Sequence, residues 1–176
     1  MSTTKWSIDT AHSEIGFKVK HMMFTNVSGN FEKFDASIET EGDDFSTAKF
    51  DFSGETSSIT TGNADRDNHL KSAYFFDAEQ FPKLNFISTA FDKISEGEYK
   101  LTGDLSLHGV TKQVRLDVEF GGLAKDPWGN TKTGLSATGK INRKDWGLNW
   151  NYALETGGVL VGEEVKLNIE LQFTQG

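Results

Sequence analysis

The chain has 176 residues, the length of one domain, and we expect a single domain over 1–176. It contains no cysteine, which excludes disulfides, thiolate metal sites and a cysteine nucleophile. A net charge of -8, without any run of Lys or Arg, argues against nucleic acid and anionic membrane surfaces as partners.

The chain starts with MSTTKWSIDT, which has no apolar segment of the kind found in signal peptides. We therefore expect a cytoplasmic location; an exported form would need a leader ahead of Met1. No stretch of about 18 apolar residues follows, so we also expect a soluble protein without stable membrane insertion.

Strict alternation of apolar and polar residues begins at 15–21, where Ile15, Phe17, Val19 and His21 share one face. This pattern is typical of a half-buried strand. In 29–38, Phe31 and Phe34 lie three residues apart, so we expect a bulge near Lys33 that keeps both side chains inward.

The alternation stops between Asn63 and Phe76, and we expect a helix over roughly 64–74 within an excursion of 63–80. Asn63 suits the N-cap, and Asp65 and Asp67 suit the first turn, where the helix dipole favours acidic groups. Pro82 then ends the excursion.

Strand alternation returns at 84–91, 99–107, 114–120, 133–141 and 165–173. Antiparallel sheets allow one apolar and one solvated face. About eight long strands of this kind close into an antiparallel up-and-down barrel that is packed or holds one small ligand. The fold class is therefore all-β, and a sandwich is the alternative.

Twelve side chains would point into such a barrel and either fill a core or line a cavity. They are Phe17, Val19, Phe31, Phe34, Phe86, Leu101, Leu105, Leu116, Val118, Leu135, Ile169 and Leu171. Small residues within the strands, including Gly29, Gly103, Ala137 and Gly139, favour a cavity, although glycine in a strand also marks bulges and corners.

The segment RDNHLKSAYFF at 66–76 combines charged and aromatic residues. Helical spacing puts Arg66, His69 and Leu70 on one face, whereas Asp67 points elsewhere and meets Lys71. One interpretation is a lid in which Leu70, Tyr74, Phe75 and Phe76 line a mouth, with Arg66, His69 and His21 available to a polar head group. The alternative is that Arg66 and His69 pin the helix to the barrel.

The four histidines show none of the spacings of a metal motif, so we expect neither a metal nor a resident cofactor. A small-molecule enzyme that uses His21, Arg66 and His69 at the mouth is an alternative function. An interaction module that docks a partner through exposed aromatic residues is another.

Several motifs occur in order along the chain: WSIDTAHSEIGFKVKHM at 6–22, RDNHL at 66–70, GDLSLHGVTK at 103–112 and RKDWGLNW at 143–150. Together they resemble the YceI-like family of lipid- or polyisoprenoid-binding proteins. The resemblance implies a lipocalin-like barrel that carries a polyisoprenoid or isoprenoid quinone inside, is not an enzyme and forms a possible homodimer. Lys71, Tyr74 and Trp146 depart from the residues usual in the family, and Tyr74 puts the identity of the ligand in question.

Overall fold

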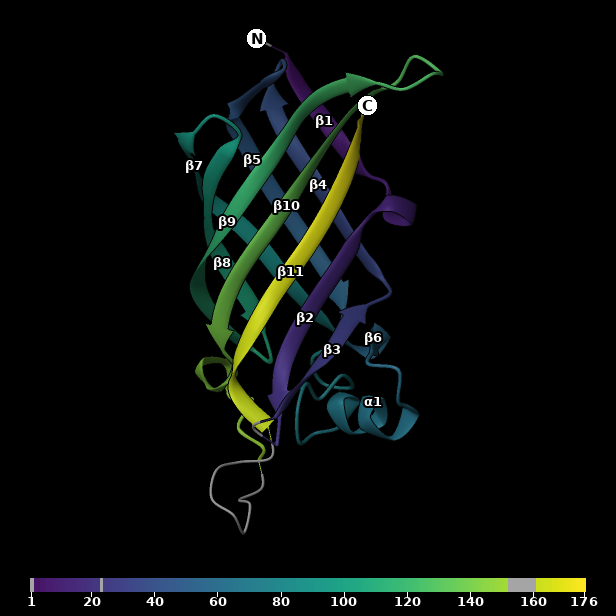
Figure 1. Cartoon of the computed structure of the whole chain (residues 1–176), viewed down its shortest axis with the longest axis vertical. Coiled ribbons are helices and arrows are strands. Elements are labelled where there is room, and N and C mark those ends of the chain that lie inside the picture. Colours follow the sequence, from purple (N-terminus) through teal and green to yellow (C-terminus); the bar gives the residue numbers. More distant parts are fainter. Residues whose placement is uncertain (1, 23, 152–160) are drawn as a thin grey trace.

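The computed structural model describes residues 2–22, 24–151 and 161–176, and long antiparallel strands dominate it (Figure 1). In chain order the elements are β1 (Thr3–Ile8), η1 (Thr10–His12), β2 (Glu14–His21), β3 (Thr25–Phe31), β4 (Phe34–Glu41), β5 (Asp44–Glu55), η2 (Thr56–Ser58), β6 (Ile59–Thr60), α1 (Ala64–Lys71), β7 (Lys83–Ser95), β8 (Glu98–Leu107), β9 (Val110–Lys125), β10 (Thr131–Asn142), η3 (Arg143–Trp146) and β11 (Val161–Gln175).

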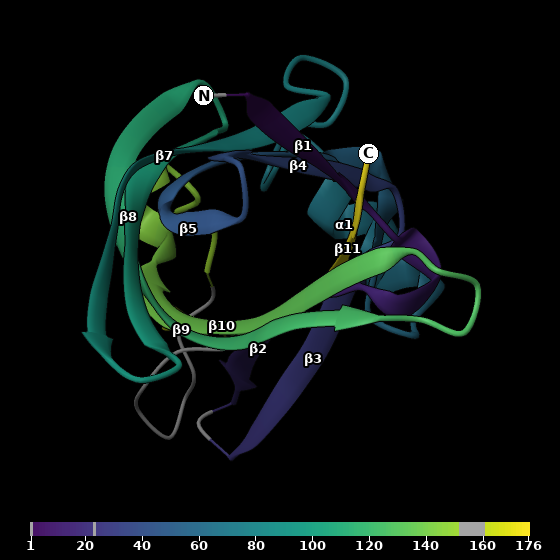
Figure 2. The ribbon, with the colours of Figure 1, turned by 90° about the horizontal axis from the view of Figure 1, so that it is seen from above.

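Eight of the strands close into a barrel in the order β1-β4-β5-β7-β8-β9-β10-β11, and β11 pairs with β1 to complete the circle. The expected antiparallel barrel of about eight strands is therefore confirmed, and Figure 2 shows the ring of strands from above. Every strand segment expected from alternation lies in a strand of the structure, because one apolar face must be buried inside the ring.

A side branch of β2, β3 and β6 widens the lower end of the barrel. β11 pairs with β1 near its end, at Phe173, and with β2 over its earlier residues, from Val161 to Glu170. β3 then pairs with β2 and, at Phe31, with β6. The expected bulge near Lys33 is instead a complete break, because Glu32 and Lys33 form a bend between β3 and β4. The chain changes partners there, from β2 to β1, so a continuous strand could not serve both.

Helix α1 is shorter than the expected 64–74, since it ends at Lys71 and the cap Ser72 is extended. The cap prediction at the other end is confirmed: the Asn63 side chain accepts a hydrogen bond from the Arg66 amide, and Asp65 and Asp67 occupy the first turn. No helix in the described ranges combines the length and the apolar character needed to cross a membrane. α1 lies below the barrel wall, beside β3 and β6 (Figure 1), and so stands at one end of the interior.

Candidate ligand cavity and its mouth

The interior of the barrel contains a cavity of about 410 Å³. Its lining reaches along β11 from Val161 to Phe173. At ~3.3 Å per residue and a strand tilt of ~40°, that stretch spans roughly 30 Å along the barrel axis. A cavity of this volume and length is narrow, so its shape suits one extended chain better than a compact ligand.

Ten of the twelve inward residues named from the sequence line this cavity: Phe17, Val19, Phe31, Phe86, Leu101, Leu105, Leu116, Leu135, Ile169 and Leu171. Alternation alone placed them, because it fixes which face of a strand points inward. Further apolar lining residues include Ile15, Phe50, Leu84, Val114 and Leu167, which belong to the same alternating faces. The wall of the cavity is thus continuous hydrocarbon from several strands.

Two residues expected in the lining lie outside it. Val118 is 2% exposed but does not border the cavity; it pairs with Tyr99 and Ala137 on the neighbouring strands. Phe34 follows the bend between β3 and β4, and its ring packs against Phe52 at 6.4 Å between centroids. Both expectations were wrong because alternation identifies the inward face of a strand and not which inward side chains border empty space.

Helix α1 is fastened at the mouth through Thr61. The Arg66 Nε donates to the Thr61 hydroxyl at 2.7 Å and Nη2 donates to its carbonyl at 2.9 Å. The Asp67 carboxylate accepts from the Thr61 amide at 2.8 Å and from the Thr61 hydroxyl at 2.6 Å. The expected Asp67–Lys71 pair is therefore wrong, because the carboxylate is already used to hold the helix. Arg66 matches the alternative interpretation, in which it pins the helix.

An aromatic cluster forms the inner face of the mouth. The His69 ring packs against Trp150, with 4.5 Å between centroids, and edge-on against Phe75 at 5.5 Å. Phe75 also packs on Trp150 at 5.6 Å and is 5% exposed. His69 borders the cavity beside these rings.

Six of the seven mouth residues named from the sequence line the cavity: His21, Arg66, His69, Leu70, Phe75 and Phe76. Tyr74 does not, and 67% of it is exposed. Its expected place in the lining was wrong because α1 ends at Lys71, so helical spacing no longer applies to residue 74. The Tyr74 ring still approaches His69, at 5.8 Å between centroids, on the outer side of the mouth.

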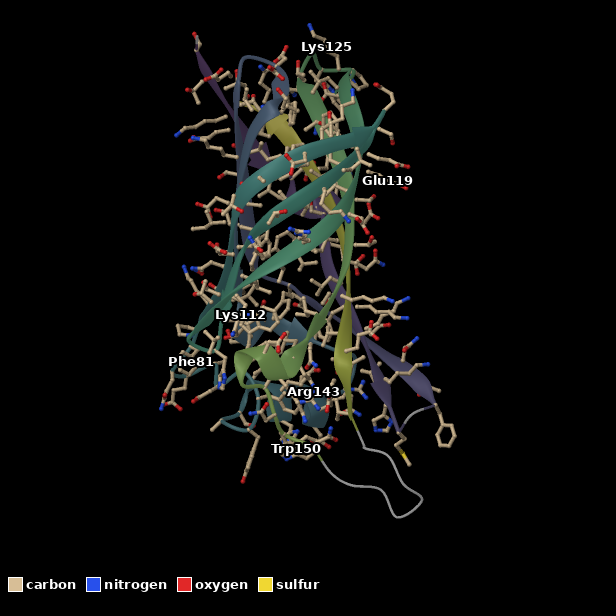
Figure 3. All side chains as sticks on the ribbon, turned by 90° about the vertical axis from the view of Figure 1, so that its left-hand side faces the viewer. Phe81, Lys112, Glu119, Lys125, Arg143 and Trp150 are labelled. Carbon is tan, nitrogen blue, oxygen red and sulfur yellow. The ribbon has the colours of Figure 1, made fainter. Side chains whose placement is uncertain are left out.

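Arg143 organises the same end of the cavity and was not named from the sequence. It is only 3% exposed and borders the cavity. Its guanidinium donates to the carbonyls of Leu148, Trp150, Val161 and Gly162 at 2.5 to 3.2 Å (Figure 3 labels Arg143 and Trp150). In the described part of the chain no carboxylate lies within salt-bridge distance of it.

Burial lowers the pKa of Arg143 below its ordinary value, and the charge of Glu163 partly opposes that shift. The guanidinium also lies over the Phe75 ring, 5.6 Å from the centroid, a favourable cation–π arrangement. A buried cation with carbonyl partners therefore holds Trp150, Val161 and the aromatic cluster together. The sequence feature that could have indicated Arg143 is its position as the single arginine of RKDWGLNW, just after the alternating segment 133–141.

The other two histidines, His12 and His108, each have a hydrogen-bonding partner within the protein. His108 forms the turn between β8 and β9 with a φ of 53°, and its Nδ1 lies 3.0 Å from the Trp146 carbonyl oxygen. The His12 Nδ1 lies 2.8 Å from the Asp9 carboxylate. Across residues 2–22, 24–151 and 161–176, His, Asp and Glu side chains form no group of three that could hold a metal ion.

An antiparallel eight-stranded barrel with an apolar interior cavity defines the class of lipocalin-like barrels. The YceI-like domain model matches residues 6–173, and the chain belongs to the YceI-like family. A UPF0312 protein of Staphylococcus aureus is 43% identical over 172 residues, which cover 97% of this chain and 98% of that protein.

Solved structures share the same barrel. A Campylobacter jejuni YCEI protein is 36% identical, with a TM-score of 0.75 over 94% of this chain and 95% of that one. A domain from Saccharophagus degradans, described as polyisoprenoid binding, has a TM-score of 0.70 over 97% of this chain and 98% of that one. Its sequence identity is 12%, so this likeness is one of fold.

Proposed function

We propose that this protein binds one long apolar chain, a polyisoprenoid or the tail of an isoprenoid quinone, noncovalently inside the barrel. The role would be carriage, storage or sequestration of that lipid. The observation that carries the proposal is the narrow cavity of about 410 Å³ with its hydrocarbon wall and the aromatic cluster at its mouth.

The energetics of burial support a ligand of this kind. Each buried CH₂ contributes roughly 0.8 kcal/mol, so a chain of several isoprene units binds tightly without polar contacts. Such a site selects girth and length more than head-group chemistry. Polar groups at the mouth, His69 and Arg143, would then meet whatever head group the tail carries.

The comparisons support the same class of ligand. The Saccharophagus degradans domain with the same barrel is described as polyisoprenoid binding. The description of the Staphylococcus aureus relative names no ligand, so the identity of the lipid rests on experiment.

Catalysis is the weaker alternative. A small-molecule enzyme would need reactive groups free to meet a substrate at the mouth. Instead the Arg66 guanidinium and the Asp67 carboxylate both bond to Thr61 and hold α1 in place. His69 lies among aromatic rings. We therefore assign Arg66 and Asp67 to the architecture of the mouth and propose that the protein is not an enzyme.

The direct test is mass spectrometry of an organic extract of the protein, purified from the cells in which it naturally occurs. We expect a stoichiometric isoprenoid. Leu105→Trp and Leu171→Trp serve as matched variants, because both place a bulky ring where the cavity now lies. Each should lose the lipid and keep a cooperative thermal transition.

An extract without lipid from folded wild-type protein would contradict the proposal. Equal lipid content in wild type and both tryptophan variants would show that the lipid lies elsewhere. A cytoplasmic location and a homodimer belong to the same proposal. Fractionation of the source cells tests the first, and size-exclusion chromatography with light scattering tests the second.

A further inference from the structure

The tip of the β2–β3 hairpin exposes apolar side chains to water beside the mouth. Phe24 is 80% exposed and Met22 is 40% exposed. The hairpin extends away from the ring of strands at the lower end of the barrel (Figure 2). A turn in which the Phe24 amide donates to the His21 carbonyl at 3.1 Å fixes this tip. Phe24 therefore protrudes from the body of the molecule, and Met22 is partly exposed beside it.

The backbone conformation at Met22 is unfavourable for a methionine. Met22 has a φ of 52°, in the left-handed region that glycine and asparagine occupy with less strain. A turn that served only to connect β2 to β3 would use one of those residues. A strained, exposed methionine next to an exposed phenylalanine suggests that the apolar side chains themselves have a use.

The tip is continuous with the cavity. Lys20 and His21, the last two residues of β2 before Met22, border the cavity, as does Val27 on β3. On the other side of the mouth, Tyr74 is 67% exposed and directly precedes Phe75 of the lining. An apolar chain that leaves the cavity here would meet exposed apolar side chains before it met open water.

The charge of the hairpin is opposite to that of the molecule. Residues 15–31 contain Lys18 and Lys20 and no Asp or Glu, within a chain of net charge -8. Both lysines are exposed on β2, close behind the apolar tip. Apolar tip residues with lysines behind them suit the boundary between acyl chains and phosphate groups.

We propose that the β2–β3 hairpin tip, Met22 and Phe24 with Lys18 and Lys20 behind them, docks reversibly on a phospholipid bilayer, from which the bound chain enters the cavity. This inference rests on the proposed function, since a protein without a lipid ligand has no need of such contact. It replaces the expectation from net charge that anionic membranes are poor partners, because local charge governs a contact made by one tip.

The first experiment is flotation of the protein with vesicles of phosphatidylethanolamine that contain a minority of phosphatidylglycerol. Phe24→Ser combined with Met22→Ser should lower the partition coefficient by at least about tenfold, since the burial of two apolar side chains is lost. Both residues are exposed, so the variant should keep the wild-type thermal transition.

Trp128→Ser is the matched control. Trp128 is 83% exposed and lies in the turn between β9 and β10, at the opposite end of the barrel. We expect it to leave vesicle binding unchanged. Lys18→Gln with Lys20→Gln should weaken binding at low salt and remove most of its salt dependence. Absence of vesicle binding by wild type, or equal losses in the Trp128 and hairpin variants, would overturn the proposal.

A second experiment separates this inference from the proposed function. A fluorescent polyisoprenoid is offered to each protein either in detergent micelles or in donor vesicles of the same composition. We expect the hairpin variant to bind the probe from micelles like wild type and to take it from vesicles at least about tenfold more slowly. Equal uptake from vesicles would overturn the docking proposal alone. Failure of wild type to bind the probe from micelles would overturn the proposed function, and docking with it.

Discussion

The upper and lower halves of the barrel share the same strands but differ in how their interior is filled. In the upper half, Phe45 packs against Trp6 and Phe120 with 5.1 and 4.7 Å between ring centroids. Phe91 and Tyr99 stack at 4.3 Å close by. In the lower half, leucines such as Leu105 and Leu171 and rings such as Phe17 and Phe86 cover the wall and leave a cavity between them.

The difference shows that alternation determines which side chains form the wall, whereas contacts between rings across the barrel determine where the interior is filled. Aromatic rings from opposite strands meet across the upper half and close it. Around the cavity, rings such as Phe17 and Phe86 lie beside leucine and valine side chains on the wall and leave space between them. Stability should accordingly concentrate in the upper half and binding in the lower half.

The largest expected effect compares the same substitution in both halves. Phe45→Ala removes a ring that is 5% exposed and contacts two other rings, so it should lower the free energy of unfolding by about 3–5 kcal/mol. Phe17→Ala removes a ring that already borders the cavity and should cost less than about 2 kcal/mol. Urea denaturation measures both. Equal losses would show that the two halves are equally well packed.

Arg143 tests whether the mouth is held together by one side chain. Arg143→Met keeps the apolar stem but deprives four carbonyls of their donor, so the free energy of unfolding should fall by about 3 kcal/mol. Lipid content should fall as well, because Trp150 and Val161 lose their anchor. Arg143→Lys is the control: it keeps the charge without the planar fork and should recover only part of the stability. Full recovery by lysine would show that charge, and not the fork geometry, matters.

Much of the barrel could be predicted from the sequence because strand burial has a period of two residues. Val165, Leu167 and Ile169 alternate with charged or amide side chains, and the structure places all three in the lining. The cap at Asn63 follows from local chemistry in the same way. Local patterns of this kind need no knowledge of distant parts of the chain.

Other features depend on contacts between distant residues and could not be predicted. Gly29, Gly103 and Gly139 suggested open space, but a Cβ there would lie 2.4 to 2.5 Å from atoms of Phe17, Phe86 and Leu116. These glycines make room for neighbouring side chains and do not create the cavity. Likewise, nothing in the sequence near Arg143 shows that its partners include Val161 and Gly162. The extent of the cavity and the burial of Arg143 both depend on how the strands close into a ring.

The attachment of α1 allows the stability of the mouth to be tested separately from that of the barrel wall. Thr61→Val removes the hydroxyl that accepts from Arg66 and donates to Asp67. Global stability should fall by only about 1 kcal/mol, because the barrel core is untouched. Amide hydrogen exchange over 64–71 should accelerate, while exchange in β8 and β9 stays unchanged. Thr61→Ser, which keeps the hydroxyl, is the control. Unchanged exchange in the valine variant would mean that packing, not Thr61, holds the helix.

The smallest expected effect concerns the segment between β1 and β2. There the pairing partner of β11 changes from one of these strands to the other. The Asp9 carboxylate caps η1 there and lies 2.8 Å from the His12 Nδ1. The hydrogen bond to His12 holds the pKa of Asp9 below its ordinary value of 3.8, and burial opposes this shift only partly. The ionised carboxylate therefore adds stability above pH 3.8, and that stability is lost as the pH falls through the lower pKa of the folded state.

Asp9→Asn should cost less than about 1 kcal/mol at neutral pH, since the pair is partly solvated. The difference from wild type should shrink as the pH falls below 3.8, because the wild-type carboxyl then becomes neutral as well. Thermal melts over an acidic pH series measure this difference, with His12→Gln as the partner variant. A difference that stayed constant down to the lowest pH would mean that the lost stability does not come from the charge of Asp9, since asparagine can still accept from the Ala11 amide.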